Sequence, residues 1–478
     1  MFVSARFRWT TLATAIVLII GCSKARLAVE DAPVRAEPIA LPAPPAPAAP
    51  PAPAEPGAAL DRIEVTGSRI AASTSESALP VMEVASADRA AAAPVVQIAD
   101  GESPPATQAG VLTAGDYDDL LNPQLYARYA ETFLQAHPQT ELPFVDTRSA
   151  VRVRVLGRDG EPVSFAEVTI HDAQGEPRQL FTAANGMALF FPGLDALPAQ
   201  LQIRVAASGT APVERSMALD SLPDDRTVTV QLPVSGRAPR ALDLLLVIDT
   251  TGSMTDELKY LQTELAAITA SLRRTHPQLD IRVGLIAYRD VGDAYVTRSF
   301  ALTEDLAGLR RDLAAQLAEG GGDYPEAVQQ AFADANRAEW RKDAVKALLH
   351  VADAPPHGDR MGATWNEALQ LRQRGVHIVP VAASGVADDA QYLMRSAAAL
   401  TQSRYLFLTD DSGVGLPHAE PDVPCYVVTR LDGLISRVLA TLVSGRRVEP
   451  APMDILRTSG DYARGVCLPA AGARTTRE

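Results

Sequence analysis

The chain has 478 residues, of which 47% are hydrophobic and 21% are charged, so it has room for two or three domains with packed cores. Its formal net charge of −14 at pH 7 argues against nucleic acid as a partner and leaves no basic patch for an anionic membrane surface.

Residues 1–21 have the pattern of a secretion signal. Arg6 and Arg8 precede an apolar core, Leu12–Ile20, which is too short to cross a bilayer core of about 30 Å as a helix. The following Ile19-Ile20-Gly21-Cys22 resembles the lipobox of bacterial lipoproteins. The resemblance implies cleavage before Cys22 and acylation of that cysteine. Because Ser23 follows rather than Asp, it also implies sorting to the outer membrane of the cell envelope. The alternative is an uncleaved anchor helix.

Residues 22–115 are predicted to form a disordered linker. Its first part, 32–56, is rich in Pro and Ala and favours a semi-rigid polyproline II spacer of about 3 Å per residue. The rest has few large apolar residues. Residues 116–145 are predicted to contain a short helix, with Pro123 in its first turn.

Residues 146–235 are predicted to form a small all-β sandwich. Val151, Val153 and Val155 alternate with other residues, and turn signals such as Asn185-Gly186 separate similar runs. The segments Gly160-Glu-Pro-Val163, Ala166-Glu-Val168 and Thr182-Ala-Ala-Asn-Gly186 resemble carboxypeptidase-regulatory-like and Ig-like modules. That resemblance implies a spacer or binding surface and no catalysis.

Residues 241–445 alternate buried strands with helical patterns, which predicts a doubly wound, Rossmann-like α/β sheet. The expected strands are Leu244–Ile248, Ile281–Ala287, Val345–Ala352, Val376–Ala382 and Tyr405–Leu408, with Val296–Ala301 at an edge. The expected helices lie near 258–272, 304–317, 325–338, 363–374, 387–400 and 429–443.

Oxygen-bearing side chains cluster where these strands end. Asp249 ends the first strand, and Thr251 and Ser253 follow in the turn to a helix. Asp323 lies in a glycine-rich loop, and Asp353 follows another strand. Open α/β sheets bind ligands at the carboxyl ends of their strands. Carboxylate and hydroxyl oxygens suit a hard cation such as Mg²⁺.

The pattern Asp-x-Thr-x-Ser, then a Gly-Gly loop about seventy residues later, then a strand-terminal Asp, resembles a von Willebrand factor type A (VWA) domain with its metal-ion-dependent adhesion site. The resemblance implies that Thr251 and Ser253 bind Mg²⁺ (or Mn²⁺ or Ca²⁺) directly. Asp249 and Asp353 would act mainly through water, and an unidentified protein partner would supply a further oxygen. Asp323 stands where the family usually has Thr, so it should strengthen metal binding and weaken the attraction for an acidic partner.

Two other functions remain open. The Asp249 loop also resembles the phosphorylated loop of haloacid-dehalogenase-type phosphotransferases, in which Asp is the nucleophile, with Asp410-Asp411 as an acidic metal loop. Against this, no lysine follows Lys346. The third possibility is a structural envelope spacer whose metal site is inert. We expect no enzymatic activity.

Four other side chains are weaker candidates for the site. Asp290 and Asp293 are either groups that support the site or solvated loop acids. His350 and His357 flank Asp353 but lack the spacing of a zinc site, so we expect packing or surface roles.

Residues 446–478 are predicted to be a C-terminal tail. With Cys22 assigned to lipid, only Cys425 and Cys467 remain, and an even count in an exported protein predicts a disulfide between them. The alternative is two free thiols.

Overall fold

The computed structural model describes residues 110–413, 418 and 420–468. The predicted signal, Cys22 and nearly all of the predicted linker lie outside these residues. The described residues fall in a single unit, Ile98–Glu478. None of the helices in this part of the chain is both long and apolar enough to cross a membrane.

The largest sheet has nine strands in the order β11-β10-β9-β12-β13-β14-β1-β15-β16. Neighbouring strands from β10 through β14 are parallel, and the other neighbours are antiparallel. This is the α/β sheet that the sequence predicted. The strands are β1 Thr113–Tyr117, β9 Ala241–Asp249, β10 Asp280–Tyr288, β11 Thr297–Thr303, β12 Val345–Ala352, β13 Val376–Ala382, β14 Tyr405–Thr409, β15 Tyr426–Arg430 and β16 Arg457–Ser459.

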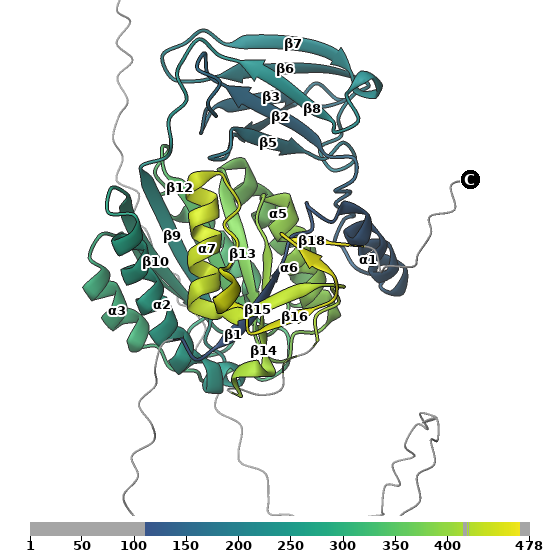
Figure 1. The fold of residues 1–478 in the computed structure, drawn as a ribbon. Helices are drawn as coiled ribbons and strands as arrows, with labels where there is room; N and C mark the ends of the chain where they lie inside the picture. Colours follow the sequence, from purple (N-terminus) through teal and green to yellow (C-terminus); the bar gives the residue numbers. More distant parts are fainter. Residues whose placement is uncertain (1–109, 414–417, 419, 469–478) are drawn as a thin grey trace, which may run out of the picture. The chain divides into compact units, whose positions relative to one another are not determined.

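Helices cover both faces of this sheet (Figure 1). In β9, Leu244 and Leu246 belong to one core and Leu245 and Val247 to the other, because successive side chains of a strand point to opposite faces. The sequence of a strand that is buried on both faces is therefore a continuous run of apolar residues. The helices of the first core are α2 Thr255–Thr275, α3 Leu306–Ala314 and α7 Leu431–Ser444; those of the second are α1 Pro123–Ala136, α4 Val328–Arg337, α5 Met361–Gln373 and α6 Asp388–Leu400.

Strand β1 differs from the prediction, which divided its residues between the linker and the helical segment. It pairs with β14 along all five of its residues and with β15 at Thr113 and Ala114. Its sequence, Thr-Ala-Gly-Asp-Tyr, has no apolar alternation, so the pairing and burial between two strands define it. A Cβ on Gly115 would lie 2.6 Å from the Phe407 ring, so only glycine fits there. The α/β sheet therefore includes residues that precede the predicted 241–445 domain.

Residues 151–231, which follow α1, form two smaller sheets around a common core that includes Val153, Ile170 and Ile203. One sheet has the order β5-β2-β8 and the other β4-β3-β6-β7. We call this the two-sheet region. Its strands are β2 Val151–Leu156, β3 Glu167–His171, β4 Pro177–Phe181, β5 Met187–Phe190, β6 Gln200–Ala206, β7 Val213–Ala218 and β8 Thr227–Gln231.

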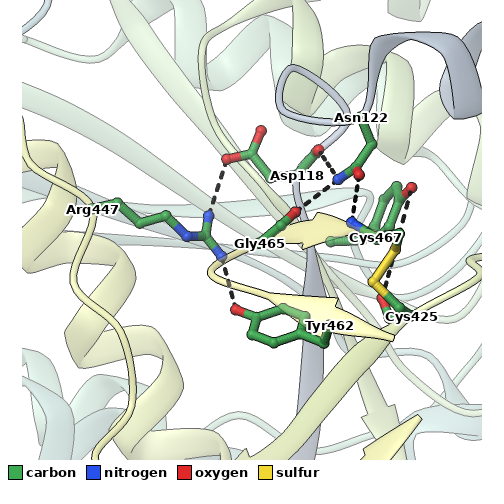
Figure 2. The surroundings of a disulfide bond; sticks show 8 residues. Asp118, Asn122, Cys425, Arg447, Tyr462, Gly465 and Cys467 are labelled. Atoms are coloured by element: carbon green, nitrogen blue, oxygen red, sulfur yellow. Dashed lines mark hydrogen bonds and ion pairs between the residues drawn. A yellow bond between two sulfur atoms is a disulfide. The ribbon is translucent and has the colours of Figure 1, made fainter. Parts of the chain in front are cut away.

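The end of the described chain is fastened to the segment that follows β1 (Figure 2). Two short strands, β17 Tyr462–Ala463 and β18 Val466–Cys467, pair with each other. Cys467 forms a disulfide with Cys425, with their Cα atoms 5.5 Å apart. Asn122 accepts a hydrogen bond from the Cys467 N–H (2.9 Å) and donates one to the Gly465 carbonyl (2.7 Å). The disulfide and Asn122 thus hold the same short hairpin from two sides.

Candidate metal site

The candidate site lies at the carboxyl ends of β9 and β12. These strands are parallel neighbours, with Ile248 in register with Val351, so Asp249 and Asp353 emerge at the same edge of the sheet. The glycine-rich loop reaches this edge through two backbone hydrogen bonds. Gly252 donates to the Gly320 carbonyl (3.1 Å), and Glu319 donates to the Thr250 carbonyl (3.1 Å).

Asp249 organises the first loop. Its Oδ1 accepts hydrogen bonds from the Thr251 N–H (2.9 Å) and the Thr251 hydroxyl (2.7 Å). The hydroxyls of Thr251 and Ser253 are 3.2 Å apart. The other carboxylate oxygen, Asp249 Oδ2, is buried and has no hydrogen-bond partner among the described residues. A buried oxygen without a donor is costly, and a cation would satisfy it.

Asp353 presents the same feature. It is buried, and its Oδ1 has no hydrogen-bond partner within the described ranges. Burial raises the pKa of Asp353, and the nearby Ser253 hydroxyl partly offsets that rise. Burial and the neighbouring Asp353 carboxylate together raise the pKa of Asp249 to about 7. Two carboxyl groups that oppose each other's ionisation in this way favour a cation between them.

Asp323, the predicted ligand from the glycine-rich loop, differs from the other acids in its burial. It is exposed, and no hydrogen bond or ion pair in the described part of the chain joins it to Asp249 or Asp353. The structure therefore does not bring Asp323 together with the other four predicted ligands through any direct contact.

The carboxyl group that does lie with them is Glu326, three residues later. Glu326 is only 3% exposed, and its Oε2 is a further buried oxygen without a partner in the described chain. Burial, followed by the charges of Asp249, Asp290 and Asp353, raises the pKa of Glu326 to about 9. A Cβ on Gly321 would lie 3.0 Å from Glu326 Oε1 and 3.3 Å from the Thr251 Cβ, so both side chains flank this glycine.

Sequence reasoning missed Glu326, although a signal was available. It directly precedes Ala327 and Val328, which start the buried face of α4. Because Glu326 adjoins the buried residues at the start of α4, its side chain is held against the protein. Asp323, by contrast, follows three glycines in the exposed part of the loop.

Tyr324 holds three loops of the site together. Its hydroxyl lies 3.1 Å from the Asp353 carbonyl and 2.9 Å from the Gly385 carbonyl, and it accepts a hydrogen bond from the Ala387 N–H (2.7 Å). Tyr324 therefore ties the glycine-rich loop to the segments that follow β12 and β13.

The lesser candidates support loops or fill the core. Asp293 accepts hydrogen bonds from the N–H groups of Gly321 (2.8 Å) and Asp290 (3.1 Å), and Asp290 pairs with His357 (2.7 Å). His350 is buried beside Tyr288, and burial lowers its pKa to about 3, so it remains neutral at pH 7.

The lysine that a phosphotransferase would need does not lie beside Asp249. Lys346 is in register with Asp243, six residues before Asp249, and so lies toward the other end of the strands. Asp410 pairs with His418 and Asp411 with Arg457, at the end of β14. Within the described residues, no set of three or more His, Cys, Asp or Glu side chains forms a ready metal-binding group. A cation here would therefore depend on the hydroxyls of Thr251 and Ser253 as well.

Comparison with known families identifies this region. Residues 244–355 match the family model described as von Willebrand factor type A domain, and this segment contains all five predicted ligands and Glu326. The chain therefore contains a VWA domain.

Two curated proteins match a part of the chain. The alpha-protein kinase vwkA of Dictyostelium discoideum is 32% identical over 123 residues, which are 26% of this chain and 20% of that protein. The putative ariadne-like RING finger protein R811 of Acanthamoeba polyphaga mimivirus is 35% identical over 124 residues, which are 24% of this chain and 11% of that protein. The chain thus spans a fifth or less of the length of these relatives.

Solved structures that the chain matches include the conserved hypothetical protein BatB from Bacteroides thetaiotaomicron, with 13% identity and a TM-score of 0.30 over 42% of this chain and 98% of that one. The SpRpn10 VWA domain has 14% identity and a TM-score of 0.29 over 41% of this chain and 93% of that one. The family assignment rests on the sequence match.

Proposed function

Starting from the VWA domain at residues 244–355, we propose that this protein binds one divalent cation and uses it to engage a protein partner. Mg²⁺ is the expected ion, with Mn²⁺ or Ca²⁺ as substitutes. The observation that carries the proposal is the set of buried carboxylate oxygens without hydrogen-bond partners among the described residues, on Asp249, Asp353 and Glu326.

The donor set fits a hard cation. The hydroxyls of Thr251 and Ser253 supply neutral oxygens, and Asp249 and Asp353 supply negative charge, directly or through water. Burial, and after it the repulsion between the carboxyl groups, raises the pKa of Asp249 and Glu326 in the free protein, and a doubly charged ion would relieve that repulsion. A position left open on the ion would accept an oxygen from the partner.

We assign no catalytic residue. Binding explains the shared position of the hydroxyls and carboxylates, whereas a phosphotransferase would need a lysine near Asp249, and Lys346 lies toward the other end of the strands. The inert spacer remains the alternative if the site binds no metal.

We predict that Glu326→Gln lowers the affinity for Mg²⁺ by about tenfold or more, because glutamine keeps the side-chain shape but cannot ionise to balance the charge of the ion. Asp323→Thr should change the affinity less, since Asp323 is exposed and Thr is the residue usual in the family. Calorimetric titration of the full chain measures both effects. A larger loss in Asp323→Thr than in Glu326→Gln would make Asp323 the ligand from this loop.

Outside the described residues, we propose that the chain is an outer-membrane lipoprotein of a bacterial envelope, anchored through Cys22. The Pro/Ala-rich linker would hold the folded part away from the lipid. The two-sheet region resembles an Ig-like module in its sequence, and we propose that it acts as a further spacer.

Lipid anchoring predicts that Cys22→Ala moves the protein out of the outer-membrane fraction, because the only acylation site is lost. The test is fractionation of cells that express the full chain, with Cys22→Ala and Cys467→Ala compared side by side. Cys467→Ala leaves the lipobox intact and should fractionate as the unmodified protein does. An unchanged distribution of Cys22→Ala would contradict the lipoprotein assignment.

A further inference from the structure

The edge of the sheet that carries the candidate metal site is strongly acidic. We define the metal edge as Asp249 together with residues 289–296, 317–326, 353–360, 385–389 and 410–411. These residues include twelve Asp and Glu and two arginines, and two further arginines contact them: Arg457 pairs with Asp411, and Arg298 stacks on the Tyr295 ring. Even with these four arginines and a divalent cation, the acids at this edge outnumber the positive charges. The field at this edge therefore repels acidic groups that approach the metal.

Much of this charge is accessible. The side chains of Glu319, Asp359 and Asp410 are 62%, 75% and 64% exposed. Asp323 and Asp388 are exposed as well. Of the two arginines within the metal edge, Arg289 is buried against Glu319, whereas the Arg360 side chain is 57% exposed and lies 3.6 Å from Asp359.

Apolar groups stand among these acids. Val291, Leu317 and Tyr324 are 62%, 60% and 43% exposed. The loops that carry them are neighbours, because Arg289 donates a hydrogen bond to the Leu317 carbonyl (2.8 Å) and Asp293 accepts one from the Gly321 N–H (2.8 Å). Large exposed side chains beside a candidate binding site mark a contact surface.

Tyr324 is suited to meet a cation. Its hydroxyl is fixed by contacts with Asp353, Gly385 and Ala387, while its residue remains 43% exposed. An aromatic ring that is already held in place loses little freedom on binding and attracts lysine or arginine through its face.

We propose that the metal edge binds a basic, partly apolar segment of a protein partner. Lysine or arginine side chains of that segment would meet the exposed carboxylates and the Tyr324 ring. A neutral oxygen of the segment, such as a backbone carbonyl, would meet the cation. This inference rests on the proposed metal-dependent function and differs from the acidic ligand that the family resemblance implies.

Selection from a library of random 12-residue peptides, displayed on phage and captured by the full chain in Mg²⁺, tests the inference. We expect the retained peptides to be enriched in Lys and Arg beside apolar residues. Enrichment in Asp and Glu, or no enrichment over an uncoated surface, would overturn it.

Charge variants identify the surface. Asp359→Asn with Asp388→Asn should weaken binding of a selected basic peptide by about three- to tenfold at low salt and leave Mg²⁺ binding unchanged. Asp220→Asn with Asp224→Asn removes the same charge from exposed positions of the two-sheet region and should change neither. Equal weakening by both pairs would contradict a specific surface.

The two proposals fail in different ways. A chain that binds no Mg²⁺ in a calorimetric titration contradicts the proposed function and the inference with it. A chain that binds Mg²⁺ but selects acidic peptides contradicts the inference alone.

Discussion

Asp249→Ala is expected to abolish the stabilisation of the protein by Mg²⁺. Asp249 organises the first loop by accepting two hydrogen bonds from Thr251. Its other oxygen, Oδ2, is buried and has no hydrogen-bond partner among the described residues, so we expect it to bind the cation. Its loss removes both the charge and the loop geometry. A ligand at a hundred times its dissociation constant stabilises the folded state by about 2.7 kcal/mol, and this gain should disappear.

Thermal unfolding of the full chain, with Mg²⁺ and with chelator, measures this effect. Asp249→Asn separates charge from shape, because it keeps an acceptor oxygen for Thr251 but loses the negative charge. It should also lose most of the response to Mg²⁺. Asp220→Ala, which removes an exposed carboxylate of the two-sheet region, is the matched control and should respond as the unmodified protein does. A full Mg²⁺ response in Asp249→Ala would place the cation elsewhere.

The second large effect is expected from the disulfide. Replacing Cys425 and Cys467 together by alanine should lower the free energy of unfolding by about 2–4 kcal/mol. The bridge closes a segment of 42 positions, for which the chain-entropy model gives about 4 kcal/mol. The loss should be smaller than that limit, because Asn122 and the pairing of β15 with β16 also hold this part of the chain.

Urea unfolding of the double variant and of the unmodified chain measures the difference. Labelling of free thiols in the oxidised, unfolded protein is the independent check, and neither Cys425 nor Cys467 should react. Reaction of both, or equal stability of the two proteins, would contradict the bridge.

The sequence predicted those elements whose pattern follows from burial alone. Strand β9 is apolar at successive positions because it is covered on both faces, and α2 repeats its buried leucines with the helical period. These patterns involve residues that are close together in the chain, so they can be recognised in a single sequence.

Strand β1 could not be predicted in this way. It has no local strand pattern and is defined by pairing with β14, some 290 positions later in the chain, and by a glycine that fits beneath an aromatic ring. The relevant information lies in its neighbours in space.

The candidate site shows the same division. Asp249, Thr251, Ser253 and Asp353 were predicted as ligands because they lie at strand ends, and the register of β9 with β12 brings Asp249 and Asp353 to one edge. The choice between Asp323 and Glu326 depends on how the glycine-rich loop folds back toward Thr250 and Gly252, which residue spacing does not specify.

Calorimetric titration of the full chain with Mg²⁺, after treatment with chelator, tests the central claim most directly. We predict saturable binding of one ion per chain, absent in Asp249→Ala. If titration of the unmodified chain gave only the heat of diluting Mg²⁺, that result would contradict the claim. Release of phosphate from a phosphomonoester that depends on Asp249 would contradict the assignment of binding without catalysis.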